Sequence, residues 1–125
     1  MIAADTSTWI AYLQGDPGKD AQMLDQALTD RQVLMIPVVL TELLSDPGLP
    51  AEVAETLAEV PLIELEAGYW QRAGALRAKA LSTQRKARLG DALIAQTCVD
   101  SGIALLTRDK DFQAFMRTAR LRLVL

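Results

Sequence analysis

Short apolar runs alternate with longer amphipathic segments from one end of the chain to the other. The runs have the length of buried strands and are bounded by polar or turn-forming residues; they cover 1–4, 33–36, 62–65, 103–106 and 121–125. The last run alternates apolar and other residues, as expected of a half-exposed strand at a sheet edge. Strands that alternate with helices predict an α/β fold, a three-layer sandwich with a mostly parallel five-strand sheet.

Helical spacing is clearest in the segment 67–81, where one apolar stripe consists of Tyr69, Ala73, Leu76 and Ala80. We expect this stripe to face the core, because residues three or four positions apart share a helix face. The same spacing predicts further helices over 6–13, 21–29, 38–45, 51–59, 91–100 and 112–116. Stretches rich in Gly, Pro and polar residues predict the turns at 14–20 and 46–48.

The length of 125 residues predicts one domain spanning 1–125. No apolar run approaches the roughly 18 residues of a membrane span, and no basic-then-apolar leader pattern is present at the start. We therefore expect a soluble, cytoplasmic protein that does not contact a membrane. The single cysteine, Cys98, has no second cysteine with which to form an internal disulfide, and we expect it to be a small buried hydrophobe.

Histidine is absent from the chain. This excludes Ser-His-Asp and Cys-His catalysis, zinc sites with histidine ligands, and the usual near-neutral general base. Any chemistry must come from carboxylates, hydroxyls, lysine or a bound metal. The formal net charge of −3 argues against a generally basic surface for nucleic acid, although local basic patches remain compatible with it.

Four acids differ from the other twelve in their surroundings. Asp5 follows the first strand, Glu42 lies within an almost wholly apolar helical segment, Asp91 opens a helix and Asp109 follows the fourth strand. Capping is the structural alternative for the three aspartates, because Asp is a preferred N-cap and Thr107 is a second candidate for the last helix. Acids of the turns and solvated faces are assigned no role: Asp16, Asp20, Asp25, Asp30 and those within 52–66.

Glu42 is expected to be shielded from bulk water, since its neighbours in 38–44 are nearly all apolar. A lone buried charge costs several kcal/mol, so the carboxylate should be neutral, metal-bound or paired with an arginine. If all four acids converge, each pair at ~5 Å repels by roughly 3 kcal/mol at an effective dielectric of ~20. Six such pairs rival the stability of a whole domain, ~5–15 kcal/mol. Such a cluster must take up protons or a cation.

A cluster of oxygen ligands without His or Cys selects hard cations, so Mg²⁺ or Mn²⁺ is expected. Cations held by carboxylates are typical of phosphoryl chemistry, in which one or two ions activate a water and stabilise the leaving oxygen.

These residues resemble the four motifs of PIN-domain ribonucleases, and their order and the chain length are most similar to the VapC-type toxins of toxin–antitoxin pairs. The motifs lie at 5–7, 39–43, 90–95 and 106–112. The resemblance implies a PIN-like fold with strand order 3-2-1-4-5, in which the strand ends that carry Asp5 and Asp109 meet at the topological switch point. It also implies metal-dependent cleavage of single-stranded RNA, a homodimer and inhibition by a cognate antitoxin.

Site residues are carried over from the resemblance. The implied catalytic metal ligands are Asp5, Glu42, Asp91 and Asp109, with Asp111 as an accessory or alternative fourth acid. Ser7 and Thr107 are expected to orient a water or a carboxylate. Basic side chains near the acids are candidates to hold RNA phosphates, with a solvated basic loop as the alternative: Arg85, Lys86, Arg88, Arg108 and Lys110.

The antitoxin is expected on the helices between Trp9 and Glu59, where apolar residues exceed what a small core needs. The hypothesis is thus a Mg²⁺- or Mn²⁺-dependent endoribonuclease toxin. Its alternative is a non-catalytic PIN-like module that binds RNA or protein, in which the acids only cap helices. An aspartyl-phosphate phosphatase ranks last. The pattern of such enzymes has a second Asp two residues after the first, and Ser7 occupies that position here.

Overall fold

The computed structural model describes residues 1–124, apart from the side chain of Arg117. Along the chain the elements are β1(Ile2–Ala4), α1(Thr6–Gln14), α2(Lys19–Thr29), α3(Pro37–Leu44), α4(Ala51–Glu59), α5(Tyr69–Ser82), α6(Leu89–Ser101), β2(Ala104–Leu106), the short 3₁₀ helix η1(Lys110–Phe112) and α7(Gln113–Ala119). Each predicted helix is present, with ends within a few residues of the predicted ones. The α/β class is confirmed.

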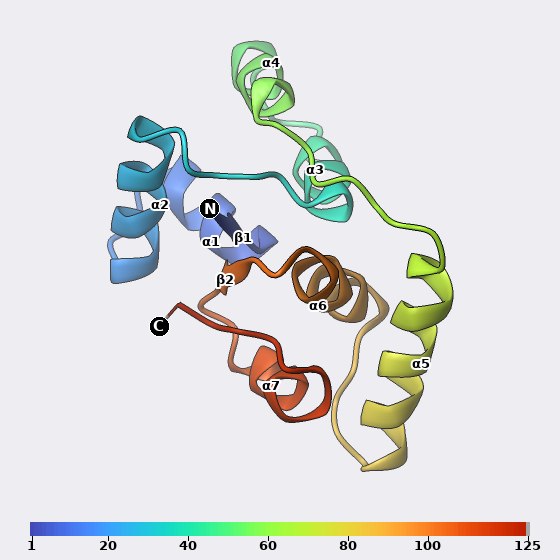
Figure 1. The fold of residues 1–125 in the computed structure, drawn as a ribbon. Coiled ribbons are helices and arrows are strands. Elements are labelled where there is room, and N and C mark those ends of the chain that lie inside the picture. The colour runs from blue at the N-terminus through green and yellow to red at the C-terminus, as the bar shows by residue number, and fades with distance from the viewer. Residues whose placement is uncertain (125) are drawn as a thin grey trace.

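The two strands lie side by side at the centre of the molecule (Figure 1). They are parallel, with Ile2 opposite Ala104 and Ala4 opposite Leu106. Parallel strands need cover on both faces, and helices supply it. In Figure 1, α1 and α2 lie to one side of the strands, and α6 and α5 lie to the other. The packing of α1 against α2 and of α5 against α6 agrees with this arrangement.

The prediction of a five-strand sheet is wrong in extent. Outside β1 and β2, the predicted strand segments form only isolated parallel bridges within the described residues, which pair Ile2 with Val33, Met35 with Leu62, and Leu105 with Leu123. These bridges nevertheless arrange the five segments in the expected order 3-2-1-4-5. Leu125, the last residue of the predicted edge strand, lies outside the described residues.

Backbone chemistry explains why the second segment is so short. Pro37 has no N–H to donate to a neighbouring strand, and its fixed φ suits the first turn of a helix. It is the first residue of α3, so the extended segment ends at Ile36. The Met35 amide still donates to the Pro61 carbonyl at 2.7 Å, and the Ile63 amide donates to the Met35 carbonyl at 2.9 Å. A few ladder hydrogen bonds are therefore formed without a full strand.

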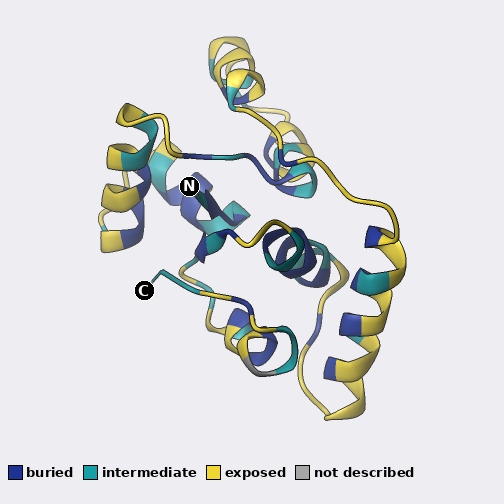
Figure 2. Cartoon of the chain, viewed as in Figure 1, coloured by how far each residue is buried: buried dark blue, intermediate teal, exposed yellow. Residues whose placement is uncertain are grey.

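Helix α6 is the central helix of the core. It is buried on most of its circumference, whereas α5 is buried only on the side that faces it (Figure 2). The predicted stripe of α5 is confirmed, since its four residues are all buried. Tyr69 begins that stripe, and its hydroxyl donates to the Leu93 carbonyl of α6 at 2.6 Å. Gly102 ends α6 at a φ of 65°, a left-handed conformation that glycine adopts without strain, and β2 follows at once.

Cys98 is buried in α6, as predicted, and its burial raises the pKa of the thiol to about 12. It is therefore a structural residue without thiolate character at neutral pH. Among the described residues, no helix combines the length and the apolar character needed to cross a membrane.

The central strand pair should carry much of the stability. Leu105 of β2 is fully buried, so Leu105→Ala should lower the free energy of unfolding by about 2–5 kcal/mol, the range for large-to-small core substitutions. The matched control is Leu81→Ala on α5, where the leucine is 47% exposed and the change should stay within about 0.5 kcal/mol. Urea unfolding of the three proteins measures both values. Similar small effects at the two positions would contradict a core centred on β1 and β2.

Candidate active site

Asp5 directly follows β1, and its carboxylate caps α1. The Thr8 amide donates to Asp5 Oδ1 at 3.0 Å, and the Ser7 hydroxyl donates to Oδ1 and Oδ2 at 2.7 and 2.9 Å. The residue is 3% exposed. This burial raises the pKa of the carboxyl, although hydrogen bonds from Thr107, Thr8 and Ser7 lower it. Asp5 is thus a helix cap and a buried acid at the end of a central strand, so the two interpretations of the sequence are compatible.

Thr107 joins the ends of the two strands. Because Ala4 pairs with Leu106, Asp5 and Thr107 are the next residues at the same edge of the sheet. The Thr107 hydroxyl donates to Asp5 Oδ2 at 2.6 Å and accepts from the Asp109 amide at 3.0 Å. The prediction that the strand ends carrying Asp5 and Asp109 meet is confirmed, and Thr107 links them.

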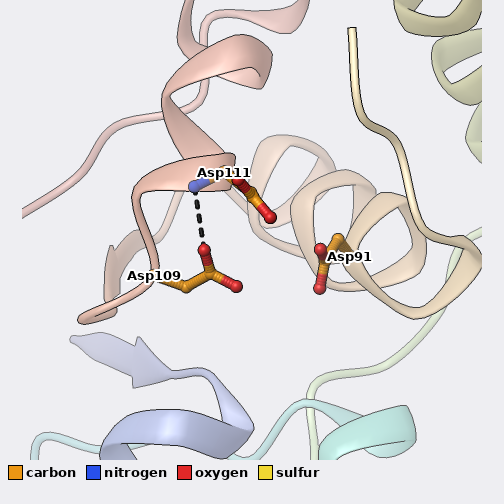
Figure 3. Close-up of side chains that lie close together, drawn as sticks. All are labelled: Asp91, Asp109 and Asp111. Atoms are coloured by element: carbon orange, nitrogen blue, oxygen red, sulfur yellow. Dashed lines mark hydrogen bonds between the residues drawn. The ribbon is translucent and has the colours of Figure 1, made fainter.

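Three carboxylates gather beside this junction. Asp91, Asp109 and Asp111 each offer an oxygen, and these oxygens all lie within 4.8 Å of one another. Figure 3 shows Asp91 on the first turn of α6, facing Asp109 and Asp111 of the segment that follows β2. The segments are brought together because α6 and β2 are consecutive, and the turn after β2 leads back over the start of α6.

The capping alternative holds for Asp109 and fails for Asp91. Asp109 caps η1, and its Oδ1 accepts from the Asp111 amide at 2.9 Å. Helix α6 begins earlier than predicted, with Arg88 at the N-cap position and no side-chain cap. Asp91 is therefore inside the first turn, where its carboxylate points toward the other two acids (Figure 3).

Both burial and neighbouring acids act on the pKa of Asp91. Burial is the main reason why the pKa of its carboxyl is raised to about 6; the charge of Asp109 adds to this, Arg88 lowers it, and Asp111 and Asp5 raise it by less. Asp5 thus acts on Asp91 electrostatically, although it lies outside the group of three. An all-oxygen donor set without His or Cys fits a hard divalent cation such as Mg²⁺ or Mn²⁺.

Glu42 differs from its prediction. Its side chain is exposed, and among the described residues its partner is the Thr6 hydroxyl, which donates to Oε1 at 2.9 Å, rather than an arginine. The reason is that α3 fully buries only Val39 and Leu43, four positions apart, whereas Glu42 lies at the groove between α1, α3 and α4. Glu42 Oε1 still lies 4.0 Å from the position of a Cβ built on Gly90, so the carboxylate faces the start of α6.

The candidate phosphate ligands fall into two groups. Arg85, Lys86 and Arg88 are exposed in the connector before α6, and Lys110 is exposed beside Asp109. Arg108 instead forms an ion pair: its Nε and Nη2 donate to the two carboxylate oxygens of Asp20 at 2.8 and 2.7 Å. The first group is exposed to solvent, whereas Arg108 is already paired.

Asp20 was expected in a turn or on a solvated face, and that expectation is wrong. It lies in the first turn of α2, is 5% exposed, and also accepts from the Thr8 hydroxyl at 2.9 Å. The Arg108 hydrogen bonds are the main reason why its pKa is lowered to about 2. Neither Asp20 nor Thr8 has a local sequence signal for this contact, because Arg108 is 88 residues away from Asp20.

Comparisons with known proteins show the family and the fold. The family model described as PIN domain matches residues 2–117. Among solved structures, a member of the VapBC family of toxin–antitoxin systems, VapBC-5 from Mycobacterium tuberculosis, is similar with a TM-score of 0.69 and 20% identity over 98% of this chain and 96% of that one. FitAcB from Neisseria gonorrhoeae is similar with a TM-score of 0.70 and 18% identity over the same shares of the two chains. No curated protein sequence matches the chain significantly.

Asp91→Asn should stabilise the metal-free protein at neutral pH. The pKa of Asp91 is about 6 in the folded protein and 3.8 for a free side chain. The folded protein therefore keeps its full stability below pH ~3.8, where the carboxyl is protonated in both states, and loses stability as the pH rises through ~6 and the carboxyl ionises. Removing the charge should add about 1–2 kcal/mol at pH 7.5 after solvent screening, and less than half of that at pH 4.5. Urea unfolding in chelator measures both values.

Asp100→Asn is the control with the opposite sign, because Arg72 lowers the pKa of Asp100. Its carboxylate contributes stability above its unfolded pKa, and this is lost as the pH falls, so the variant should be less stable at pH 7.5. An Asp91→Asn protein that is also less stable at pH 7.5 would contradict repulsion among the acids.

Proposed function

The chain belongs to the PIN domain family, and from this membership and the acidic cluster we propose that it is a Mg²⁺- or Mn²⁺-dependent endoribonuclease that cleaves single-stranded RNA as the toxin of a toxin–antitoxin pair. The observation that carries the proposal is the approach of the Asp91, Asp109 and Asp111 oxygens to within 4.8 Å of one another, beside a buried Asp5. The similarity to VapBC-5 and FitAcB supports the toxin assignment.

Asp91, Asp109 and Asp111 are the residues proposed to hold the cation, with Asp5 as a further ligand on the buried side and Glu42 at the exposed rim. A divalent cation bound there supplies charge stabilisation for a phosphodiester and lowers the pKa of a water. Asp109 and Asp111 are both proposed as the fourth acid, since both contribute an oxygen to the cluster.

The hydroxyl residues have a preparatory role. Ser7 donates to both oxygens of Asp5, and Thr107 donates to Asp5 Oδ2 while it accepts the Asp109 amide. These contacts hold two acids in fixed orientations before any ligand arrives, which lowers the entropic cost of assembling the site. Ser7 and Thr107 are therefore proposed to orient the carboxylates.

Substrate phosphates are proposed to contact the connector before α6. Arg85, Lys86 and Arg88 are exposed there, and Arg88 is close enough to lower the pKa of Asp91. Lys110 is exposed on the other side of the cluster. Cations at the rim of an acidic pocket hold an anionic backbone while the pocket itself stays available for the cation that neutralises it.

An antitoxin is proposed to bind the groove between α1, α3 and α4. This groove has a volume of about 410 Å³, and its lining includes Ile10 and Leu13, which are 42% and 38% exposed. Leu13 and Val53 also line an adjoining hollow of about 300 Å³ that reaches Trp9. Continuous exposed apolar surface of this kind marks a protein-binding site. A homodimer and a cytoplasmic location are further parts of the proposal that rest on the family resemblance.

The alternative function is a non-catalytic PIN-like module that binds RNA or protein. It would account for Asp5 and Asp109 as helix caps. It does not account for Asp91, which caps no helix and lies among like charges. Endoribonuclease activity is therefore the better supported of the two.

Cleavage should depend on a divalent cation and on Asp91. Wild-type protein should cut single-stranded RNA in Mg²⁺ or Mn²⁺ and should stop in chelator. Asp91→Asn should lower the rate by at least about 100-fold, since even partners of metal ligands contribute 10- to 100-fold. The control is Asp30→Asn, which removes an exposed acid from the end of α2 and should leave the rate unchanged. Gel analysis of labelled RNA measures the four reactions.

The same proteins distinguish the metal-dependent enzyme from the non-catalytic binding module. Mn²⁺ at about 100 times its dissociation constant should stabilise the native protein by about 2.7 kcal/mol, seen as a rise in melting temperature that Asp91→Asn loses. Equal cleavage in chelator would contradict the proposed enzyme. A wild-type protein that binds RNA without cutting it, and whose melting temperature ignores Mn²⁺, would support the binding module.

Leu13→Asp should disrupt antitoxin binding without affecting cleavage. The probe is the proposed antitoxin, sought as the product of a small gene adjacent to the one that encodes this chain. A charge in the centre of the groove should weaken the complex by at least about tenfold, because apolar anchors in such interfaces contribute 1–2 kcal/mol or more. Leu81→Asp is the control, an exposed leucine on α5 away from the groove. Equal binding by both variants in a titration would place the antitoxin elsewhere.

A further inference from the structure

Arg108 and Asp20 form the more buried of the two ion pairs in the described part of the chain. The side chains of Arg108 and Asp20 are 35% and 7% exposed, against 41% and 13% for Arg72 and Asp100. Both oxygens of Asp20 accept from the guanidinium, and the Thr8 hydroxyl donates to Oδ2. Three donors on one carboxylate make a pair with a defined geometry.

Each end of this pair is adjacent to the acidic site. Arg108 lies between Thr107, which donates to Asp5, and Asp109, a member of the carboxylate group. Thr8 contacts both acids: its amide donates to Asp5, and its hydroxyl donates to Asp20. The hydrogen bonds thus form a chain from the start of α2, through α1, to the turn after β2.

Local backbone also accommodates the pair. Gly18, just before α2, has a φ of 154°, a conformation that glycine adopts more readily than other residues. A Cβ at this position would lie 2.6 Å from Asp20 Oδ1 and 2.7 Å from Arg108 Nη2. A larger residue would displace these charged groups from their present positions. The glycine therefore leaves room for the ion pair as well as for the turn.

We propose that Asp20 and Arg108 are positioning residues: their ion pair fixes the turn at 107–109, so that the Asp109 carboxylate faces the other acids. The Arg108 guanidinium is then a structural group and not a phosphate ligand. The effect on cleavage rests on the proposed function, but the geometry of the turn can be tested in metal-free protein.

Asp20→Asn tests the proposal, because it removes one charge of the pair at a residue outside the acidic cluster. The matched control is Asp100→Asn, which breaks the other bidentate pair, between α5 and α6. In chelator, Asp20→Asn should speed hydrogen exchange of the Asp109 and Asp111 amides by about tenfold or more, since their acceptors belong to the same turn. Asp100→Asn should leave these two amides unchanged.

Metal affinity and cleavage kinetics provide a second test of the positioning role. Asp20→Asn should weaken Mn²⁺ binding by about 10- to 100-fold, the range for groups that orient metal ligands, and should lower kcat for RNA with KM unchanged. If Arg108 contacts phosphates instead, Asp20→Asn would release it, and kcat and Mn²⁺ affinity would stay at the wild-type values. That result, or unchanged exchange at 109 and 111, would overturn the proposal.

Failure of the proposed function and failure of the variant to fold can each be distinguished from failure of this proposal. If wild-type protein neither binds Mn²⁺ nor cuts RNA, the proposed function fails, and the exchange comparison still decides the role of the pair. If Asp20→Asn does not fold, Arg108→Lys replaces it, because lysine keeps the charge but cannot span both carboxylate oxygens. Unchanged exchange at 109 and 111 in that variant would likewise overturn the proposal.

Discussion

The structure depends on keeping the Asp5 carboxylate satisfied away from water. An unpaired buried carboxylate costs several kcal/mol, and here a backbone amide and two hydroxyls hydrogen-bond to it. These donors come from α1 and from the end of β2, so one side chain ties together a strand, the helix after it and a segment 102 residues away. The parallel register of β1 and β2 is the geometry that brings Thr107 within reach of Asp5.

Like charges at the carboxyl ends of the strands create a second constraint. Asp91, Asp109 and Asp111 are held close although their charges repel, and burial together with these neighbouring charges raises the pKa of Asp91. Arg108 is the basic residue between Thr107 and Asp109, and its charge is compensated by Asp20. The cluster therefore keeps a negative field that a hard cation can neutralise. Exposed positive charge near the cluster lies in the connector before α6 and at Lys110, where it suits an anionic chain.

Short sequence patterns predict the features that depend on neighbouring residues. Helical periodicity predicts α4 to the residue and the buried stripe of α5, and an acid after an apolar run predicts the position of Asp5. The extent of the sheet is not local, since it depends on hydrogen bonds from distant segments, and the run 33–36 supplies only single bridges before Pro37 starts a helix. The exposure of Glu42 and the pairing of Asp20 likewise depend on which helix faces which, information that no short window contains.

The presence of Asp and not Asn at position 5 distinguishes a helix-capping role from a role in a cation site. Asn and Asp are about equally good N-caps, so the Thr8 hydrogen bond does not require a charge. The charge has a cost, because burial opposes it and it adds to the repulsion that raises the pKa of Asp91. In a protein without a cation, a neutral residue at this position would cap α1 and relieve that repulsion. An acid at position 5, in place of an amide, is therefore explained by the proposed cation site and not by the helix, whereas the hydroxyls around it are compatible with both roles.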